Sequence, residues 1–440
     1  MKKTLRIGVA VAAASAIALT ACGNGGGGGA ASGEISYWLW DANQLPAYQQ
    51  CADDFAAANE GLSVKITQSG WDDYWSKVTN GMASGEMADV FTNHLAKYPD
   101  FVKTEQLLAI SEDNVDMSSY QAGLADLWVG QDGTRYGLPK DWDTIALFYN
   151  KAMIADAGLT EDEINNLTWN PQDGGTFEKV VAKLTIDKNG KRGDEAGFDK
   201  NNVDVFGLGF PASGAGMGQT EWSWFVATTG WRHTDQNPWG TKYNYDDPRF
   251  QDSIAWWAGL IEKGYMPKLE TTIGASMNDN FGASKSAINA NGSWMTNAYF
   301  DYEGIEVGLA PTPVGPEGRA SMFNGLADSI WSGTKNAENA AKWVDYLASP
   351  ACQNVVGEMG VVFPAIASGT EKASAAFEAK GIDVTPFTMH VEEGTTFLFP
   401  IGDNAAKIEG IMKPAMDAVL NGTPASSLTA ANEQVNALFK

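Results

Sequence analysis

The chain has few of the residues on which several protein classes depend. Its 440 residues include only three cysteines and three histidines. So few cysteines exclude a disulfide-dense scaffold, and so few histidines leave little room for a multi-histidine metal centre. Basic residues are also scarce, since 30 Lys and Arg stand against 54 Asp and Glu, a formal net charge of −24. This charge argues against nucleic-acid binding and against docking on an anionic membrane through a basic patch.

Hydrophobic and aromatic residues are plentiful. With 44% hydrophobic and 19% charged residues, the chain is not a disordered sequence. Its length is enough for two or three domains with cores of their own. Tryptophan is abundant, at 16 residues against 13 tyrosines. A core alone seldom needs so many, so we expect some indole rings to face a ligand.

The N-terminal segment predicts export. Residues 1–21 read as a signal peptide, because a basic start precedes an apolar run, Ile7–Leu19, that is too short for a comfortable membrane span. The run ends in Leu19-Thr20-Ala21-Cys22, which resembles a bacterial lipobox with Cys22 as the lipidated residue. The alternative is an ordinary signal peptide followed by a chance cysteine. Residues 22–33 would then be the lipidated cysteine and a glycine-rich tether. We expect an extracytoplasmic protein anchored to the outer face of the cell membrane through lipid only.

The first part of the body alternates strand and helix patterns. Strand-like segments at 34–40, 62–67 and 88–92 are separated by helical patterns at 45–59 and 72–84. A β-α-β-α-β order favours a parallel sheet with right-handed crossovers. Ligands of such sheets bind beyond the carboxyl ends of the strands, where aromatic and polar residues gather here.

The rest of the chain continues the α/β pattern. We expect strands at 142–150, 205–210, 286–289 and 305–309. We expect helices at 151–157, 221–229, 250–264, 337–347, 351–359, 407–421 and 428–438. The polar segment 187–204 is predicted to be a loop, and Gly214–Gly218 a glycine-rich turn.

Four stretches carry a family resemblance. They are Tyr136–Pro139 with Ala146–Lys151, then Ala287–Trp294, Lys335–Pro350 and Leu420–Thr423. In this order they resemble the solute-binding lipoproteins of bacterial ABC sugar importers, the group related to maltose-binding protein. The resemblance implies an α/β, two-lobed periplasmic-binding-protein fold with a hinge and an interlobe ligand cleft. It places one lobe at 34–142 plus 294–360 and the other at 143–293 plus 361–440.

The resemblance also implies a function, against which two alternatives stand. It implies reversible capture of an oligosaccharide by a monomer and delivery to an ABC permease, without catalysis. The first alternative is a lipid-anchored glycoside hydrolase, which would need two carboxylates about 5–9 Å apart. No motif points to such a pair, although 54 acidic residues do not exclude one. The second is a binding protein for a non-sugar solute, such as a peptide or an anion.

Sugars present apolar C–H faces and many hydroxyl groups, so a sugar site needs aromatic platforms and polar side chains. The platform candidates lie near loops or strand ends: Trp40, Trp71, Trp224, Trp231 and Trp294. For each of them, packing in a core is the alternative. Trp71 and Trp294 are preferred, because the resemblance maps their loops to the cleft. Tryptophans within helix or strand patterns are expected in the core: Trp128, Trp256, Trp257, Trp331 and Trp343.

The hydrogen-bonding candidates are polar residues near the same loops. They are Asp41, Asn93, His94, Lys140, Asp141, Asn291, Asn324 and His390. Carboxylates accept from hydroxyl groups, and amides both donate and accept. For each, an ordinary turn residue is the alternative.

Two further features concern metal and cysteine. Asp187, Asn189 and Glu195 place oxygen ligands in one loop, somewhat like a calcium site. Arg192 stands where that motif needs glycine, so a plain surface loop is the favoured interpretation, and we expect no other cofactor. Cys51 and Cys352 lie on predicted helices of one lobe, and outside the cytoplasm such a pair favours a disulfide over two buried thiols.

Overall fold

The computed structural model describes residues 33–209, 212–272 and 276–440. The predicted signal peptide, Cys22 and the tether up to residue 32 lie outside this part of the chain. Residues 33–440 form one compact unit. Within the described residues, no helix combines the length and the apolar character needed to cross a bilayer.

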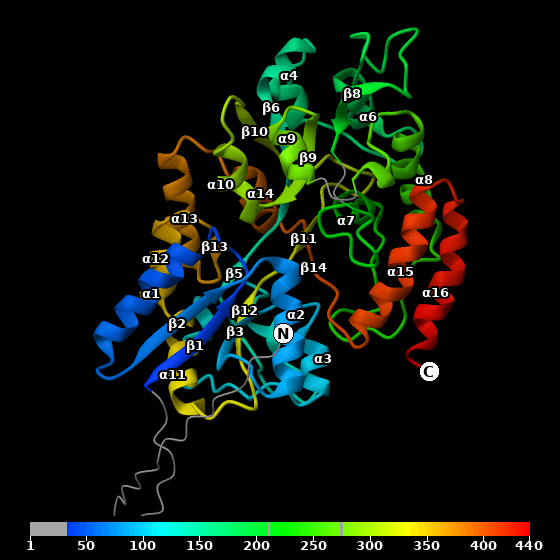
Figure 1. Ribbon diagram of the computed structural model, residues 1–440. Coiled ribbons are helices and arrows are strands. Elements are labelled where there is room, and N and C mark those ends of the chain that lie inside the picture. The colour runs from blue at the N-terminus through cyan, green and yellow to red at the C-terminus, as the bar shows by residue number, and fades with distance from the viewer. Residues whose placement is uncertain (1–32, 210–211, 273–275) are drawn as a thin grey trace, which may run out of the picture. The chain divides into compact units, whose positions relative to one another are not determined.

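The first large sheet has the order β2-β1-β3-β12-β4 (Figure 1). Its parallel strands are β1 (Glu34–Leu39), β2 (Ser63–Gln68) and β3 (Val90–Asn93). Helices α1 (Leu45–Ala58) and α2 (Trp71–Ser84) connect them, which confirms the predicted β-α-β-α-β order. Strand β12 (Ala327–Ile330) is antiparallel to both β3 and β4 (Leu138–Pro139).

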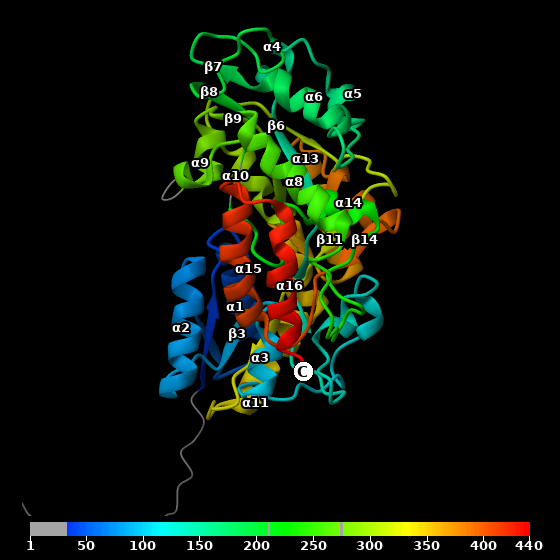
Figure 2. The ribbon, with the colours of Figure 1, turned by 90° about the vertical axis from the view of Figure 1, so that its right-hand side faces the viewer.

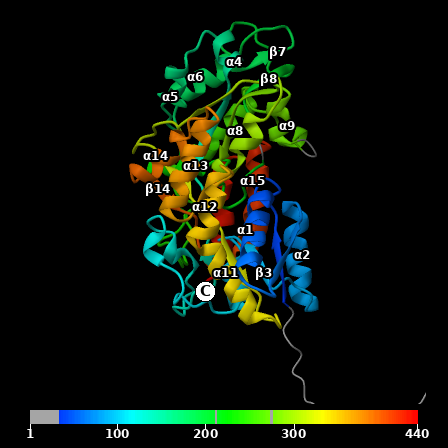
Figure 3. The same cartoon turned by 90° about the vertical axis from the view of Figure 1, so that its left-hand side faces the viewer.

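The alternating pattern of β1 decides which helices cover each face of this sheet. Ile35, Tyr37 and Leu39 are buried in a core with α1, α11 (Ala337–Ala348) and α12 (Pro350–Glu358). The intervening Trp38 and Trp40 pack on the opposite side, with α2 and α3 (Tyr98–Lys103) (Figure 3). This two-residue period is what a strand between two helical layers requires.

The second large sheet has the order β10-β6-β9-β8-β7. Its strands are β6 (Ile145–Asn150), β7 (Ile186–Asp187), β8 (Val203–Leu208), β9 (Ser286–Gly292) and β10 (Val307–Ala310). All residues of β6 are buried, as its near-continuous apolar sequence predicts. One hydrophobic core joins this sheet to α6 (Gly175–Leu184), α8 (Pro248–Glu262), α15 (Ala405–Leu420) and α16 (Leu428–Ala437) (Figure 2).

Two small sheets lie where the chain passes between the large ones. In the first, β5 (Asp141–Trp142) pairs with β13 (Phe363–Pro364), and in the second, β11 (Ser321–Phe323) pairs with β14 (Thr396–Leu398). The remaining helices are α4 (Lys151–Asp156), α5 (Glu161–Asn165), α7 (Ser223–Val226), α9 (Met277–Gly282), α10 (Thr296–Phe300), α13 (Ala367–Ala379) and α14 (Thr385–Glu392).

The predicted lobe boundaries need correction at two places. Strand β10 falls within 294–360, assigned to the first lobe, yet it pairs antiparallel with β6 of the second sheet. The chain therefore returns to the first sheet after Ala310, not at residue 294. Helix α13, assigned to the second lobe, packs against α12 instead. A four-residue apolar strand does not itself specify which sheet it joins, and the resemblance alone placed these crossings.

The five tryptophans predicted to be core residues are all buried. Trp128 and Trp343 are fully inaccessible, and Trp256, Trp257 and Trp331 are each at most 9% exposed. The predicted disulfide is also present. It joins Cys51 on α1 to Cys352 on α12, two helices on the same face of the first sheet.

Replacing both cysteines by alanine should destabilise the protein without changing its fold. The bridge closes a loop of 301 residues, and a disulfide over a long loop stabilises typically by about 2–4 kcal/mol by restricting the unfolded chain. Chemical unfolding of C51A/C352A against wild type measures the loss. Alkylation of both cysteines in the denatured but unreduced wild-type protein would contradict the bridge.

Candidate ligand-binding cleft

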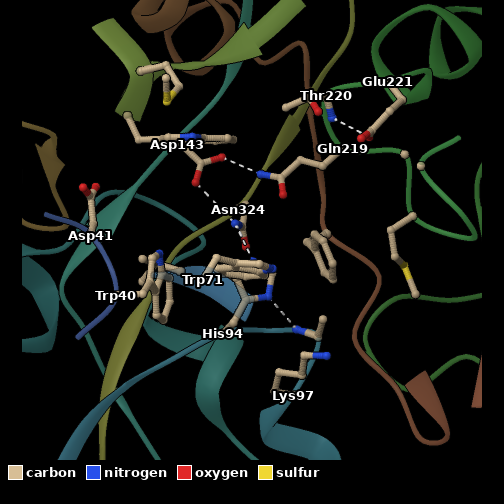
Figure 4. A pocket seen from close by; sticks show the side chains of 18 of the residues that line it. Trp40, Asp41, Trp71, His94, Lys97, Asp143, Gln219, Thr220, Glu221 and Asn324 are labelled. Carbon is tan, nitrogen blue, oxygen red and sulfur yellow. Dashed lines mark hydrogen bonds between the residues drawn. The ribbon is translucent and has the colours of Figure 1, made fainter. Parts of the chain in front are cut away.

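A cleft of about 740 Å³ opens between the carboxyl ends of the first sheet and segments of the second. The first sheet contributes residues 40–44, Trp71, His94 and Lys97. The opposite wall comes from residues 212–221, 293–295 and the first half of α15. The crossing segments form the floor and contribute Asp141, Asp143 and Asn324 to the lining. Figure 4 shows Asp143 and Asn324 next to each other. The predicted interlobe cleft is therefore present.

Aromatic rings gather on the wall that belongs to the first sheet. Trp40 follows β1, Trp71 begins α2, and His94 follows β3, so three neighbouring strand ends bring them together. The Trp71 ring lies 5.1 Å from Trp40 and 5.7 Å from His94, both edge-on. Trp71 is 46% exposed, the highest value for a large hydrophobic side chain among the described residues. Its indole ring thus offers a flat apolar surface to a ligand.

Trp294 approaches the cleft from the second sheet. It follows Gly292, the last residue of β9, and its indole ring lies directly over that glycine. A Cβ atom on Gly292 would come within 1.8 Å of the ring, so only glycine permits this position. Trp294 is partly buried and packs against two hydrophobic cores as well as lining the cleft.

The floor of the cleft is a buried polar network. The carboxylate of Asp143 accepts a hydrogen bond of 2.9 Å from Gln219 Nε2, and its other oxygen lies 3.3 Å from Asn324 Nδ2 (Figure 4). The backbones of Asp143 and Asn324 also pair. Burial, aided by the neighbouring Asp141, raises the pKa of the Asp143 carboxyl well above its ordinary value. This network joins the crossing segments to the glycine-rich loop of the second lobe.

Three residues that line the cleft each have a buried polar atom without a hydrogen-bond partner among the described residues. The atoms are Asp141 Oδ2, Ser293 Oγ and Asn324 Oδ1. The other Asp141 oxygen accepts from the Leu326 amide at 3.1 Å. Burial raises the pKa of Asp141 to about 7, although Lys140 opposes that rise. Unsatisfied buried polar atoms cost about 1–3 kcal/mol each, and a polar ligand in the cleft would relieve that cost.

His94 is a neutral member of the wall. Burial, with a smaller effect of Lys97, lowers its pKa to about 3. Its Nδ1 atom accepts a hydrogen bond from the Ala96 amide at 3.0 Å, so the proton of the ring is on Nε2. That atom lies 3.3 Å from Asn324 Nδ2, which is also a donor, so this tautomer makes no hydrogen bond between the two. His94 therefore borders the polar network as a neutral ring.

Seven of the thirteen predicted ligand-binding residues line the cleft. They are Trp40, Asp41, Trp71, His94, Asp141, Trp294 and Asn324. Both carboxylate oxygens of Asp41 are already used, since they accept from the Asn43 amide and from Gln44 Nε2. Asp41 thus orders the turn after β1 at the rim of the cleft.

The other six predicted residues are buried outside the cleft. They are Asn93, Lys140, Trp224, Trp231, Asn291 and His390. Lys140 donates to Tyr37 Oη and Thr92 Oγ1, each at 3.1 Å, beneath the floor. Asn93 donates to Ser329 Oγ, and Asn291 donates to Asn278 Oδ1. These side chains are satisfied by the protein, so the prediction that they reach the ligand needs correction.

Two tryptophans and a histidine in this group are structural. Trp224 and Trp231 are each 1% exposed, and their indole nitrogens donate to the carbonyls of Thr220 and Asn244. They pack in the core of the second lobe, because the aromatic stretch that contains them folds inward. His390 is fully buried on α14, where its Nδ1 lies 2.8 Å from Thr395 Oγ1.

The sequence did not single out several lining residues. Asp143, Gln219, Glu221, Ser293 and Phe399 all line the cleft. Gln219 and Glu221 directly follow the glycine-rich turn, which was predicted as a turn but not assigned to the site. Asp143 stands two residues after Asp141, and this acidic pair at the start of a buried strand was the signal that could have revealed it.

The loop at 187–195 is held by its own backbone. The Asp187 carboxylate accepts N–H bonds from Asn189, Lys191 and Asp199 at 2.8–2.9 Å. Across the described ranges, no group of three or more His, Cys, Asp or Glu side chains is placed to hold a metal ion. The Asp187 carboxylate is therefore already engaged by backbone N–H groups of its own loop region.

Comparison with known proteins identifies the family of this chain. Residues 50–381 match the sequence family described as bacterial extracellular solute-binding protein. This chain belongs to that family. Proteins of this family bind solutes outside the cytoplasm.

Individual relatives are more distant. The chain is 26% identical to a lactose-binding protein of Rhizobium radiobacter over 147 residues, which is 32% of this chain and only 34% of that protein. It is 21% identical to a putative binding protein of Brucella abortus over 410 residues, 91% of this chain and 92% of the relative. An ABC substrate-binding protein of Listeria monocytogenes, solved in complex with cycloalternan, shares the fold with a TM-score of 0.78 and 18% identity. The match covers 92% of this chain and 98% of the Listeria protein.

The structural role of His390 predicts a specific loss of stability in acid. Burial, with a smaller effect of Arg319, lowers its pKa to about 4 from an unfolded value near 6.5. The unfolded chain therefore binds a proton that the folded protein excludes. Stability is full above about pH 6.5 and falls by roughly 2–3 kcal/mol as the pH approaches 4. In H390Q, the free energy of unfolding should depend less on pH between 6.5 and 4.5, by the contribution of about one proton. Chemical unfolding at several pH values in this range measures the difference. An unchanged slope would contradict the assignment.

Proposed function

We propose that this protein captures an oligosaccharide reversibly and delivers it to an ABC permease, without chemical change to the ligand. One observation carries the proposal: the exposed Trp71 ring and three residues with unsatisfied polar atoms, Asp141, Ser293 and Asn324, line the same cleft. Since every group of the cleft comes from one chain, we expect the protein to act as a monomer.

The chemistry of the cleft suits a sugar. A pyranose ring has an apolar C–H face that can lie on an indole, and hydroxyl groups around its edge that donate and accept. Trp40 and Trp71 supply the indole surface, and the floor supplies both carboxylate and amide groups. A purely apolar solute would leave the buried polar atoms unsatisfied, at a cost in free energy.

The comparisons support a sugar ligand. One relative is named for lactose, and the structural neighbour from Listeria was solved with cycloalternan. Family membership supports binding over hydrolysis. A glycoside hydrolase remains the outcome to exclude by experiment, because the cleft contains several carboxyl groups.

Calorimetry with neutral di- to hexasaccharides tests the proposal, and W71A is the informative variant. Loss of an aromatic platform typically costs about 2 kcal/mol, roughly thirtyfold in Kd. Because Trp71 is half-exposed, the melting temperature of W71A should stay close to that of wild type. W38A is the matched control, since Trp38 lies on β1 outside the cleft lining and should keep wild-type affinity.

Two results would contradict this account. Wild-type affinity in folded W71A would remove the platform role and shift it to Trp294. Recovery of shortened saccharides after incubation with the protein would support a glycoside hydrolase, whereas intact ligand supports binding.

We also propose that a lipid on Cys22 anchors the protein to the cell membrane. The apolar run before this cysteine and the glycine-rich residues after it support an anchor with a flexible tether. C22A should move the protein from the membrane fraction to the soluble extracytoplasmic fraction and abolish incorporation of labelled fatty acid. Membrane retention of C22A would contradict the anchor.

A further inference from the structure

A second cavity, which we call the side groove, adjoins the cleft. It has a volume of about 560 Å³, and its lining residues lie within 42–46, 297–301 and 380–382. The first of these segments follows β1 of the first sheet and begins α1, whereas the second belongs to α10, which comes shortly after β9 of the second sheet. The side groove therefore lies between parts of both large sheets, as the cleft does.

The side groove and the cleft share a wall. Ala42 and Asn43 line both cavities, and both residues are exposed. Their turn is held in place by Asp41, whose carboxylate accepts hydrogen bonds from the backbone amide of Asn43 and from Gln44 Nε2. A ligand that fills the cleft and continues past this turn therefore reaches the side groove directly.

The side groove offers both kinds of surface that a sugar needs. Pro46 is exposed and Phe300 partly exposed, so together they present an apolar surface to the C–H groups of a ring. Asn43 and Asp301 are exposed polar residues of the same lining. Within the described chain, neither the Asn43 side-chain amide nor the Asp301 carboxylate has a hydrogen-bond partner. Both groups are therefore available to hydroxyl groups of a ligand.

The charges of the side groove balance each other. Among its described lining residues, Asp301 is the carboxylate and Lys380 the ammonium group, and both side chains are exposed. Lys380 Nζ donates to Asn297 Oδ1 at 3.0 Å and to the Gly360 carbonyl at 3.2 Å, which leaves one of its three hydrogens for a ligand. Since neither sign is in excess, this lining suits a neutral polar ligand better than an ion.

We propose that the side groove extends the sugar site and binds the units at one end of a neutral oligosaccharide whose other units fill the cleft. This inference rests on the proposed function and adds a preference for chain length to it. The cleft, at about 740 Å³, has the size of an ordinary small-ligand site, so a short saccharide can occupy it alone. Only a longer chain also reaches the about 560 Å³ of the side groove.

Calorimetry with pairs of oligosaccharides that differ in length tests the proposal. The probes are the trimer and the hexamer of three unbranched neutral series: α-1,4-linked glucose, β-1,4-linked glucose and β-1,4-linked mannose. In a series that binds, the hexamer should bind the wild-type protein roughly tenfold tighter than the trimer, because it adds several modest contacts. One hexamer should bind per protein molecule, since a single chain occupies both cavities.

D301W fills the side groove without changing the lining of the cleft. Asp301 is exposed and lines the side groove but not the cleft. A bulky ring at this position should bring the affinity for the hexamer to within about twofold of that for the trimer, whereas the trimer should keep its wild-type affinity.

E303W is the matched control. Glu303 is also an exposed acidic residue, two positions further along the chain, and it is not among the described lining residues of either cavity. The same change of side chain at this position should leave the preference for the hexamer intact. Thermal unfolding of both variants checks that each is folded.

The outcomes separate this inference from the proposed function. If shorter saccharides bind but no hexamer binds tighter, the side groove is not part of the site and the sugar-binding function stands. If folded D301W keeps the preference for the hexamer, or loses affinity for trimer and hexamer alike, the added units do not lie in the side groove. If no saccharide of any length binds, both proposals are overturned.

Discussion

The need to satisfy buried carboxyl groups governs the region between the two large sheets. Asp141 and Asp143 occupy the segment through which the chain first leaves the first sheet, and both are nearly inaccessible. A buried charge without donors would destabilise the fold, so Asn324 and Gln219 must come from distant parts of the chain to reach Asp143. One hydrogen-bond network therefore connects the crossing segment, the floor of the cleft and the glycine-rich loop.

The same network bears on how the two sides of the cleft move. Gln219 lies on the glycine-rich loop and Asp143 on the crossing, so their hydrogen bond spans from the floor to the wall of the second lobe. Outside the cleft lining, the ring centres of Trp239 and Tyr98 lie 6.0 Å apart, and Lys103 pairs with Asp403 at 3.4 Å. The exposed ion pair contributes little. A ligand favours closure only through contacts that exist in the closed arrangement.

The sequence predicted what depends on local periodicity and missed what depends on distant contacts. The alternation in β1 and the helices around it gave the first sheet, and the placement of three strand ends gave Trp40, Trp71 and His94. Trp224 and Trp231 were misassigned because the local sequence around a tryptophan near a loop does not tell whether the side chain is buried in the core or faces a cleft. Asp143 was missed because its partners, Gln219 and Asn324, are 76 and 181 residues away.

Exposed and buried charges act over different distances in this protein. The net charge of −24 attracts cations from a distance, but salt screens exposed charges beyond about 8–10 Å, so this field affects encounter more than affinity. Asp141 differs because it is buried and screened far less. Burial, opposed by Lys140, sets the ionisation of its carboxyl group, whose pKa is about 7.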